Sequence, residues 1–182
     1  LITGPAGSGK SYLSHRFGDD VRASGGVFLS AKFDQLKQAR PLSALTSAFN
    51  DYCEALSRDG GSEGAKSFVS QLRSRLRNDD VFYLTQMIPS LANVLHQEGV
   101  LGLEAGNDCV NAQQRLQFLL CQFVEAMTES TTVSIAVHLD DLHNADDASI
   151  GVINQLFLST STQRIFFLAS SREDEKLCKM MT

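Results

Sequence analysis

The sequence predicts an α/β protein with three layers, in which helices cover both faces of a parallel β-sheet. Three observations support this prediction. Short apolar runs of strand length recur along the chain, amphipathic segments of helix length separate them, and a glycine-rich loop directly follows the first run. The predicted strands lie at residues 1–3, 27–32, 133–141 and 164–171.

The composition is that of one globular domain. The chain has 182 residues, of which 43% are apolar and 20% are charged, and this length is sufficient for a hydrophobic core. A net charge of −5 argues against a non-specific nucleic-acid surface, which requires a basic excess. No apolar run approaches the roughly 18 residues of a membrane-spanning helix. The cysteines Cys53, Cys109, Cys121 and Cys178 form no C-x-x-C pair, so we expect neither a zinc site nor disulfides.

The glycine-rich loop at residues 4–11, GPAGSGKS, fits the Walker A pattern G-x-x-x-x-G-K-[ST]. Its backbone N–H groups are expected to cradle a polyphosphate, because glycine tolerates positive φ and has no Cβ. Lys10 is expected to reach the β- and γ-phosphates, and Ser11 to offer its hydroxyl to Mg²⁺. A strand before the loop and a helix start after it favour a nucleotide site over a chance match. The predicted nucleotide-binding residues are Gly4, Pro5, Ala6, Gly7, Ser8, Gly9, Lys10, Ser11 and Tyr12.

Helices are predicted between the strands. The first begins at about residue 12, and residues 17–20 are expected to form part of a loop. Pro41 opens the next helix, and a helical insert separates the second strand from the third. The helices after the second strand are expected at about residues 41–58, 68–76, 81–87, 89–95, 111–129 and 146–159, the last with Asp146 as its N-cap.

Three arginines, Arg73, Arg75 and Arg77, lie at alternate positions in the insert. They form either an anion site or the solvated face of a helix. We adopt the solvated face, because charged runs on helices usually face water.

The third strand ends in two carboxylates, Asp140 and Asp141, which is the Walker B pattern. A phosphate-binding loop needs an acid at the tip of a neighbouring parallel strand to hold Mg²⁺, and Asp140 is predicted to do so. Asp141 is expected to orient and polarise the attacking water, a position where glutamate, with its longer reach, is common. A strand that simply ends in a polar turn is the alternative. His138, on the same strand face as Asp140, is expected to be a neutral, hydrogen-bonded core residue.

Polar residues also end the fourth strand, at the carboxyl edge where open α/β sheets bind ligands. Ser170, Ser171 and Arg172 are candidates to sense a γ-phosphate, and an ordinary surface arginine is the alternative for Arg172. The predicted catalytic residues are Lys10, Asp141 and Arg172, and the predicted metal ligands are Ser11 and Asp140.

Over nearly the whole chain, five segments resemble those of a known group of proteins and occur in the same order. They are GPAGSGKS, GGVFLSAKFDQ, RPLSALTSAF, VHLDDLHNADDAS and FFLASSRED. This group is the AAA-like ATPase module of STAND proteins, which are signal-transduction ATPases with numerous domains. The particular similarity is to the origin-recognition-complex-like AAA module. The resemblance implies sheet order 5-1-4-3-2, Walker A after strand 1, Walker B on strand 3 and a sensor near Ser171 and Arg172. The chain departs from it at Asn144, where tryptophan is usual.

The resemblance also implies that residues 1–182 are a partial domain, which lacks the start of strand 1, strand 5 and the lid subdomain. Flanking effector domains of kinase, cyclase or repeat type are the expected partners, and a homo-oligomer is an open alternative. Because strand 1 would then be a raw sheet edge, we expect the isolated piece to be poorly soluble and to bind nucleotide weakly.

The function expected from these motifs is ATP binding with Mg²⁺ and slow hydrolysis, used as a nucleotide-dependent switch in a larger signalling protein. ATP is favoured over GTP because no N-K-x-D motif is present. The alternatives are a non-hydrolysing nucleotide-gated scaffold, a DNA-replication-type AAA ATPase and a small-molecule P-loop kinase. Neither a membrane nor a nucleic acid is an expected partner, and the expected location is intracellular, in the cytoplasm.

Overall fold

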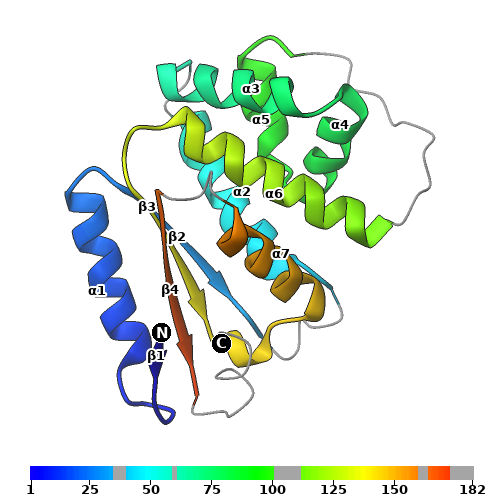
Figure 1. Cartoon of the computed structure of the whole chain (residues 1–182). Helices are drawn as coiled ribbons and strands as arrows, with labels where there is room; N and C mark the ends of the chain where they lie inside the picture. The colour runs from blue at the N-terminus through cyan, green and yellow to red at the C-terminus, as the bar shows by residue number, and fades with distance from the viewer. Residues whose placement is uncertain (35–39, 59–60, 101–111, 160–163, 173–182) are drawn as a thin grey trace.

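The computed structural model describes residues 1–34, 40–58, 61–100, 112–159 and 164–172. In these ranges, four parallel strands form a sheet in the order β1-β4-β3-β2, which agrees with the predicted order. Helix α1 covers one face, whereas α2, α6 and α7 cover the other (Figure 1). The three-layer α/β prediction is therefore confirmed. The strands are β1 (Ile2–Thr3), β2 (Val27–Lys32), β3 (Ile135–Asp140) and β4 (Ile165–Ser171), and the helices are α1 (Lys10–Ala23), α2 (Ser43–Arg58), α3 (Glu63–Arg75), α4 (Asn78–Met87), α5 (Ser90–Gln97), α6 (Ala112–Ser130), the 3-10 turn η2 (Leu142–Asn144) and α7 (Asp147–Leu158).

Strand β3 lies at the centre of the sheet, between β2 and β4, and all six of its residues are buried. Burial on both faces explains why this strand is a continuous apolar run rather than an alternating one. The strand ends at Asp140, because Asp141 turns into the left-handed region with φ 54°. The register of the sheet thus brings the end of β3 next to the end of β4.

Helix α1 is longer than predicted. We expected residues 17–20 to form a loop, but the helix continues through them to Ala23. Gly18 is buried against β2, and a Cβ at this position would lie 2.7 Å from ring atoms of Phe28. The glycine therefore permits close approach of a helix to a strand, and does not mark a turn.

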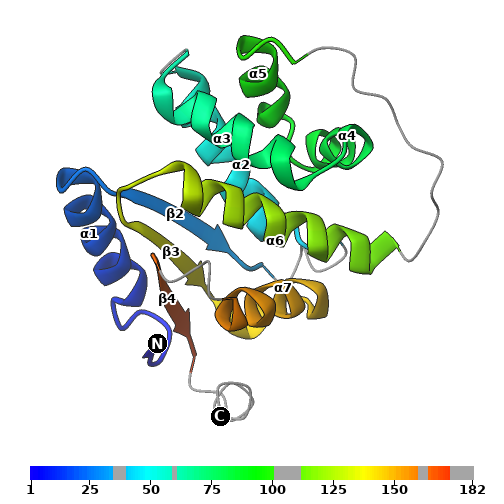
Figure 2. The same ribbon diagram turned by 45° about the horizontal axis from the view of Figure 1, so that its top comes forward.

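The insert helices α3, α4 and α5 gather beyond α2 and α6 (Figure 2). Their core is aromatic. The ring of Phe123 in α6 lies 5.1 Å from that of Phe49, 5.2 Å from that of Phe68 and 6.3 Å from that of Tyr52, all between centroids. Phe123 is fully buried, and one continuous core joins this cluster to the sheet.

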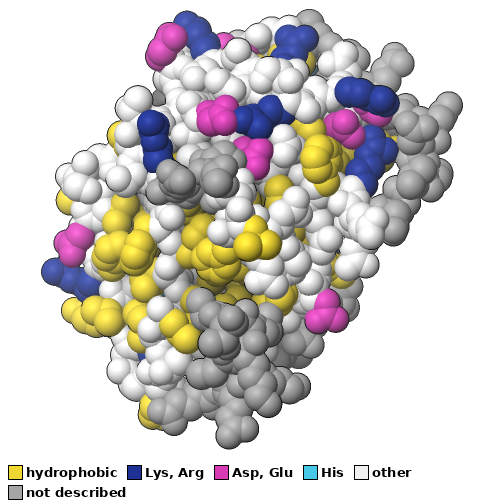
Figure 3. All heavy atoms as spheres, viewed as in Figure 1, with side chains coloured by type: hydrophobic (Ala, Val, Ile, Leu, Met, Phe, Trp, Pro, Cys, Tyr) yellow, Lys and Arg dark blue, Asp and Glu magenta, His cyan; other side chains and the backbone are white. Residues whose placement is uncertain are grey.

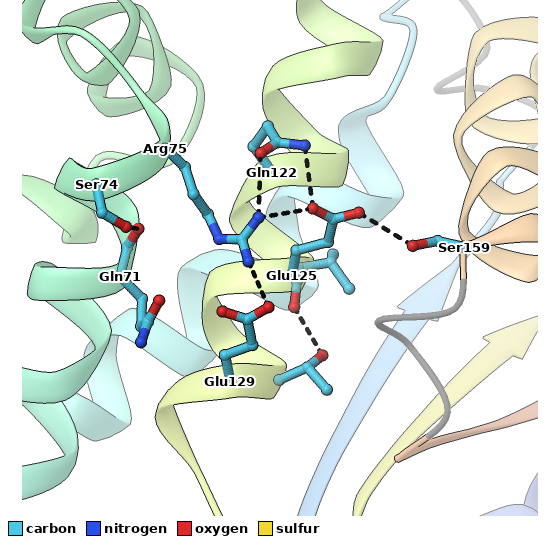
Figure 4. Close-up of polar contacts among 9 residues, drawn as sticks. Gln71, Ser74, Arg75, Gln122, Glu125, Glu129 and Ser159 are labelled. Atoms are coloured by element: carbon cyan, nitrogen blue, oxygen red, sulfur yellow. Dashed lines mark hydrogen bonds and ion pairs between the residues drawn. The ribbon is translucent and has the colours of Figure 1, made fainter.

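The interpretation of Arg75 as part of a solvated face is wrong. Its guanidinium donates to Glu125 at 2.9 Å and also pairs with Glu129, so it joins α3 to α6 (Figure 4). Glu125 accepts two further hydrogen bonds, from Gln122 and from the hydroxyl of Ser159 just after α7. The acidic side of α6 therefore fixes this arginine between helices. Arg73 is exposed as predicted, and the exposed Arg77 pairs with Asp79 at 3.0 Å.

Apolar side chains are also found on the surface, on the face between α1 and α7 (Figure 3). Strand β1 pairs only with Ser170 and Ser171 of β4, so in the described chain the earlier residues of β4 have no partner on that side. Phe166 in that part of β4 is 55% exposed. The β1 side is consequently the more open edge of β4.

Candidate nucleotide site

The loop between β1 and α1 has the backbone that its glycines predict. Gly7 and Gly9 have φ of 80° and 88°, in the left-handed region where a side chain is disfavoured. Gly9 is the N-cap of α1, and no side chain caps this helix end. The first N–H groups of α1 have no partner within the helix, and together with the helix dipole they make its N-terminus suited to an anion.

A pocket of about 330 Å³ opens beside this loop. It brings together residues from three distant parts of the chain: the loop and the start of α1, Asp141 after β3, and Arg172 after β4. Gly4 and Pro5 do not line it. The lining residues are Ala6, Gly7, Ser8, Gly9, Lys10, Ser11, Tyr12, Asp141 and Arg172.

The side chain of Lys10 is held over the loop by backbone carbonyls of the loop. Its Nζ donates to the carbonyl oxygens of Gly4 at 2.7 Å and Pro5 at 2.9 Å. Neutral carbonyls are weaker acceptors than phosphate oxygens, so an arriving polyphosphate can take over the ammonium group. Gly4 and Pro5 thus contribute to the site through Lys10.

Asp140 and Asp141 are linked through Ser170. The hydroxyl of Ser170, fully buried in β4, donates to the carboxylate of Asp140 and accepts from the backbone N–H of Asp141 at 3.3 Å. Asp140 is 6% exposed and does not line the pocket, whereas Asp141 does. The left-handed backbone of Asp141 separates the two neighbouring carboxylates.

His138 lies beneath these carboxylates and is fully buried. Its Nδ1 is 3.3 Å from the hydroxyl of Ser30, and its Nε2 is 3.8 Å from a carboxylate oxygen of Asp140. Burial lowers the pKa of His138 below its usual value, although Asp140 acts in the opposite direction. The ring is therefore a core residue that favours the neutral state, in agreement with the sequence analysis.

The three candidate γ-phosphate sensors at the end of β4 have different surroundings. Arg172 lines the pocket, whereas Ser170 binds the Walker B segment, and the buried Ser171 donates to the carbonyl of Arg172 at 2.9 Å. His143 in η2 has its Nδ1 3.5 Å from both the hydroxyl of Ser171 and the N–H of Arg172. These long contacts place the turn after β3 against the end of β4.

The capping role of Asp146 was predicted from the sequence, but its second role was not. Its carboxylate accepts from the N–H of Ser149 at 2.9 Å, which caps α7. It also accepts from the N–H of Leu42, just before α2, at 3.3 Å. Leu42 has a positive φ of 66°, so the prediction that Pro41 opens this helix is wrong, and α2 begins at Ser43.

The chemistry of the donor set suits Mg²⁺. Ser11, Asp140 and Asp141 supply only oxygen atoms, and Mg²⁺ in such sites takes one or two carboxylates together with phosphate oxygens. In the described residues, no group of three or more histidine, cysteine, aspartate or glutamate side chains could hold a metal without such help. Cys53 and Cys121 are buried free thiols, whereas Cys109 and Cys178 lie outside the described residues.

Three features together define a P-loop nucleotide-binding domain. They are a parallel sheet of this order, a Walker A loop between its first strand and helix, and carboxylates at the end of its third strand. The family model described as AAA ATPase domain matches residues 1–168, so the chain belongs to that family. Membership implies nucleotide binding, and Mg²⁺ is the usual metal. No curated protein and no solved structure matched the chain. None of the helices within the described ranges is long and apolar enough to cross a membrane.

Proposed function

We propose that this domain binds ATP with Mg²⁺ and hydrolyses it to ADP and phosphate, as a nucleotide-dependent switch in a larger multidomain signalling protein. The observation that supports this proposal best is the pocket that unites residues 6–12 with Asp141 and Arg172. An anion-binding helix end, two cations and a carboxylate are the groups that phosphoryl transfer to water requires.

In this proposal, the backbone of residues 4–12 surrounds the phosphates and Lys10 binds the β- and γ-phosphate oxygens. Ser11 and Asp140 hold Mg²⁺, which when bound neutralises part of the triphosphate charge. For Asp140 this requires that Ser170 share or give up its hydrogen bond. Ser170 thereby connects the fourth strand to the state of the metal site.

Asp141 is the proposed base. A water oxygen attacks the γ-phosphorus while the bond to the oxygen bridging the β- and γ-phosphates breaks. The water proton passes to the carboxylate of Asp141, and ADP leaves. Arg172 faces the same pocket and would stabilise the charge that develops on the phosphate oxygens.

Calorimetric titration with Mg²⁺ and ATP tests the binding step. Lys10→Ala should weaken ATP binding about 100-fold, because charge-assisted hydrogen bonds contribute up to about 3 kcal/mol each. The matched control is Lys66→Ala on the exposed side of α3, which should leave the affinity within about twofold. Equal affinities for the native protein and Lys10→Ala would contradict the proposed site.

Phosphate release tests the hydrolytic step. Asp141→Asn should bind ATP with near-native affinity but turn it over at least about 100 times more slowly, because the amide cannot accept the proton. The specific observation that favours a second function is the short side chain at this position, since aspartate reaches less far than glutamate. If native protein and Asp141→Asn release phosphate at the same rate, the domain is a nucleotide-gated scaffold that does not depend on turnover.

A further inference from the structure

We propose that the outer edge of β2 is a docking groove for an extended acidic peptide, which adds a strand to the sheet. A groove of about 480 Å³ runs along this edge. In the sheet, β3 separates this strand from β4 (Figure 2). Residues 26–30 line it, together with Arg22 near the end of α1 and the second half of α2. It shares no lining residue with the nucleotide pocket.

The backbone of β2 leaves hydrogen-bonding groups in this groove. The N–H group of Val27 donates to the carbonyl of Ser134, just before β3, and the N–H group of Phe33 donates to the carbonyl of Asp140, in β3. Both distances are 3.0 Å. Because successive residues of a parallel strand bond to alternate sides, the N–H and C=O groups of the even-numbered residues point away from β3. In the described chain, no strand pairs with that side of β2. Such an edge accepts an added strand, because the main-chain bonds of the peptide complete the ladder.

The walls of the groove are apolar, although Phe28 and Tyr52 are only 7% and 6% exposed. Tyr52 and Leu56 of α2 line it on one face of the sheet, and Phe28 of β2 packs on the other face against α1. An extended peptide directs alternate side chains to opposite faces, so it would meet both walls.

Charge decides which peptide fits. Arg22 and Arg58 line the groove, with side chains 55% and 77% exposed. Their ion pairs with neighbouring carboxylates on their own helices, at 3.5 Å and 3.4 Å, are exposed and therefore weak. Asp51 is the single carboxylate among the lining residues, and Asp19 and Glu54 beside the groove belong to these weak pairs, so an acidic strand would compete with them for the two guanidinium groups.

The same charges argue against a second copy of this chain as the occupant. Two β2 edges paired antiparallel about a two-fold axis would bring the arginines of both copies to one interface. Like charges that face each other across an interface destabilise it. A partner strand that carries glutamate or aspartate has the complementary charge instead.

An NMR titration tests the groove. The probe is a capped eight-residue peptide that alternates valine with glutamate. One control peptide carries lysine in place of glutamate, and a second carries N-methyl groups on the main-chain nitrogens that would donate to β2. The acidic peptide should shift the amide signals of Phe28 and Ser30 and slow their hydrogen exchange at least about tenfold. Each control peptide should bind at least about tenfold more weakly.

Charge reversal gives the second arm of the test. Arg22→Glu combined with Arg58→Glu should lose the acidic peptide and gain affinity for the lysine peptide. The matched control is Arg73→Glu, an exposed arginine outside the groove, which should bind the acidic peptide as the native protein does. Thermal unfolding and ATP binding, measured for every variant, separate this proposal from loss of the fold and from failure of the proposed ATPase function.

Three results would overturn the proposal. One is equal binding of the acidic and N-methylated peptides, and another is an unchanged preference after charge reversal. The third is the absence of binding at about 1 mM peptide. This includes the case in which a dimer of the chain already protects the amides of Phe28 and Ser30 from hydrogen exchange without peptide.

Discussion

Two cations of this chain, Lys10 at the nucleotide pocket and Arg75 in the helical insert, are held in opposite ways. Lys10 donates to two carbonyls of its own loop, five and six residues away in sequence. Arg75 pairs with carboxylates of a different helix, about fifty residues away, and one of them has two further donors. The first set of contacts is local, and phosphate can replace it. The second set joins α3 to α6 and to Ser159 just after α7, so it holds the insert together rather than a ligand.

The same contrast holds for the two regions as a whole. Residues 5–9 of the loop are exposed, and their shape depends on glycine backbone rather than on packing. The insert depends on buried aromatic rings centred on Phe123. Substitutions in the loop should therefore change binding with little effect on stability, and substitutions in the insert should do the reverse.

Phe123→Ala should have the largest effect on stability. Removing a fully buried aromatic ring leaves a cavity among Phe49, Tyr52 and Phe68, which should cost about 4 kcal/mol of unfolding free energy. Urea unfolding followed by circular dichroism measures this loss. At temperatures where the variant is folded, its ATP affinity should stay within about threefold of native. A loss below about 1 kcal/mol would show that the insert is not the stabilising region.

Arg75→Ala should rank second. It removes the partner of Glu125 and Glu129 in a partly buried cluster, in which Glu129 is 39% exposed, and this should cost about 2 kcal/mol. The control is Arg73→Ala, two residues earlier on the exposed side of α3, which should change stability by less than about 0.5 kcal/mol. If the two variants unfold at the same urea concentration, the cluster does not stabilise the insert.

Gly18→Ala tests a third place, where α1 packs on the sheet. The added Cβ would lie 2.7 Å from the ring of Phe28, and the strain should cost about 2 kcal/mol. Gly64→Ala is the matched control, because it is also a helical glycine but its Cβ would meet nothing closer than 3.9 Å. That change should stabilise the protein by up to about 1 kcal/mol. Equal destabilisation by both changes would remove close packing as the reason for Gly18.

The sequence was sufficient where a local pattern determines the structure. The limits of β2 were predicted at both ends, because a glycine precedes an apolar run of strand length. The Walker A spacing located the loop, and the paired aspartates located the end of β3. Since parallel strands of one sheet end at the same edge, these motifs also implied that the loop and Asp141 would lie close together.

It was insufficient where the deciding partner is distant in the chain. Gly18 alone cannot show that it faces Phe28, and Arg75 cannot show that its partners lie in α6. Different roles were predicted for the two carboxylates from their position alone, and what separates them physically, the backbone turn at Asp141 and the hydroxyl of Ser170, was not predicted. These features depend on tertiary contacts, which no single-sequence pattern records.

Tyr52→Phe should have the smallest effect at neutral pH, and its effect should appear in alkali. Burial raises the pKa of Tyr52 to about 12, against an opposing hydrogen bond with Ser130. In the unfolded chain the phenol ionises near pH 10. Between these two values the unfolded state binds fewer protons than the folded state, so native stability falls as pH rises, by about 1 kcal/mol at pH 11. The variant lacks this group and should lose correspondingly less stability between pH 9 and pH 11 in urea unfolding, while the buried Cys53 contributes equally to both proteins. Parallel stability curves for native protein and variant would mean that Tyr52 titrates as if exposed, and that the aromatic core of the insert is open to water.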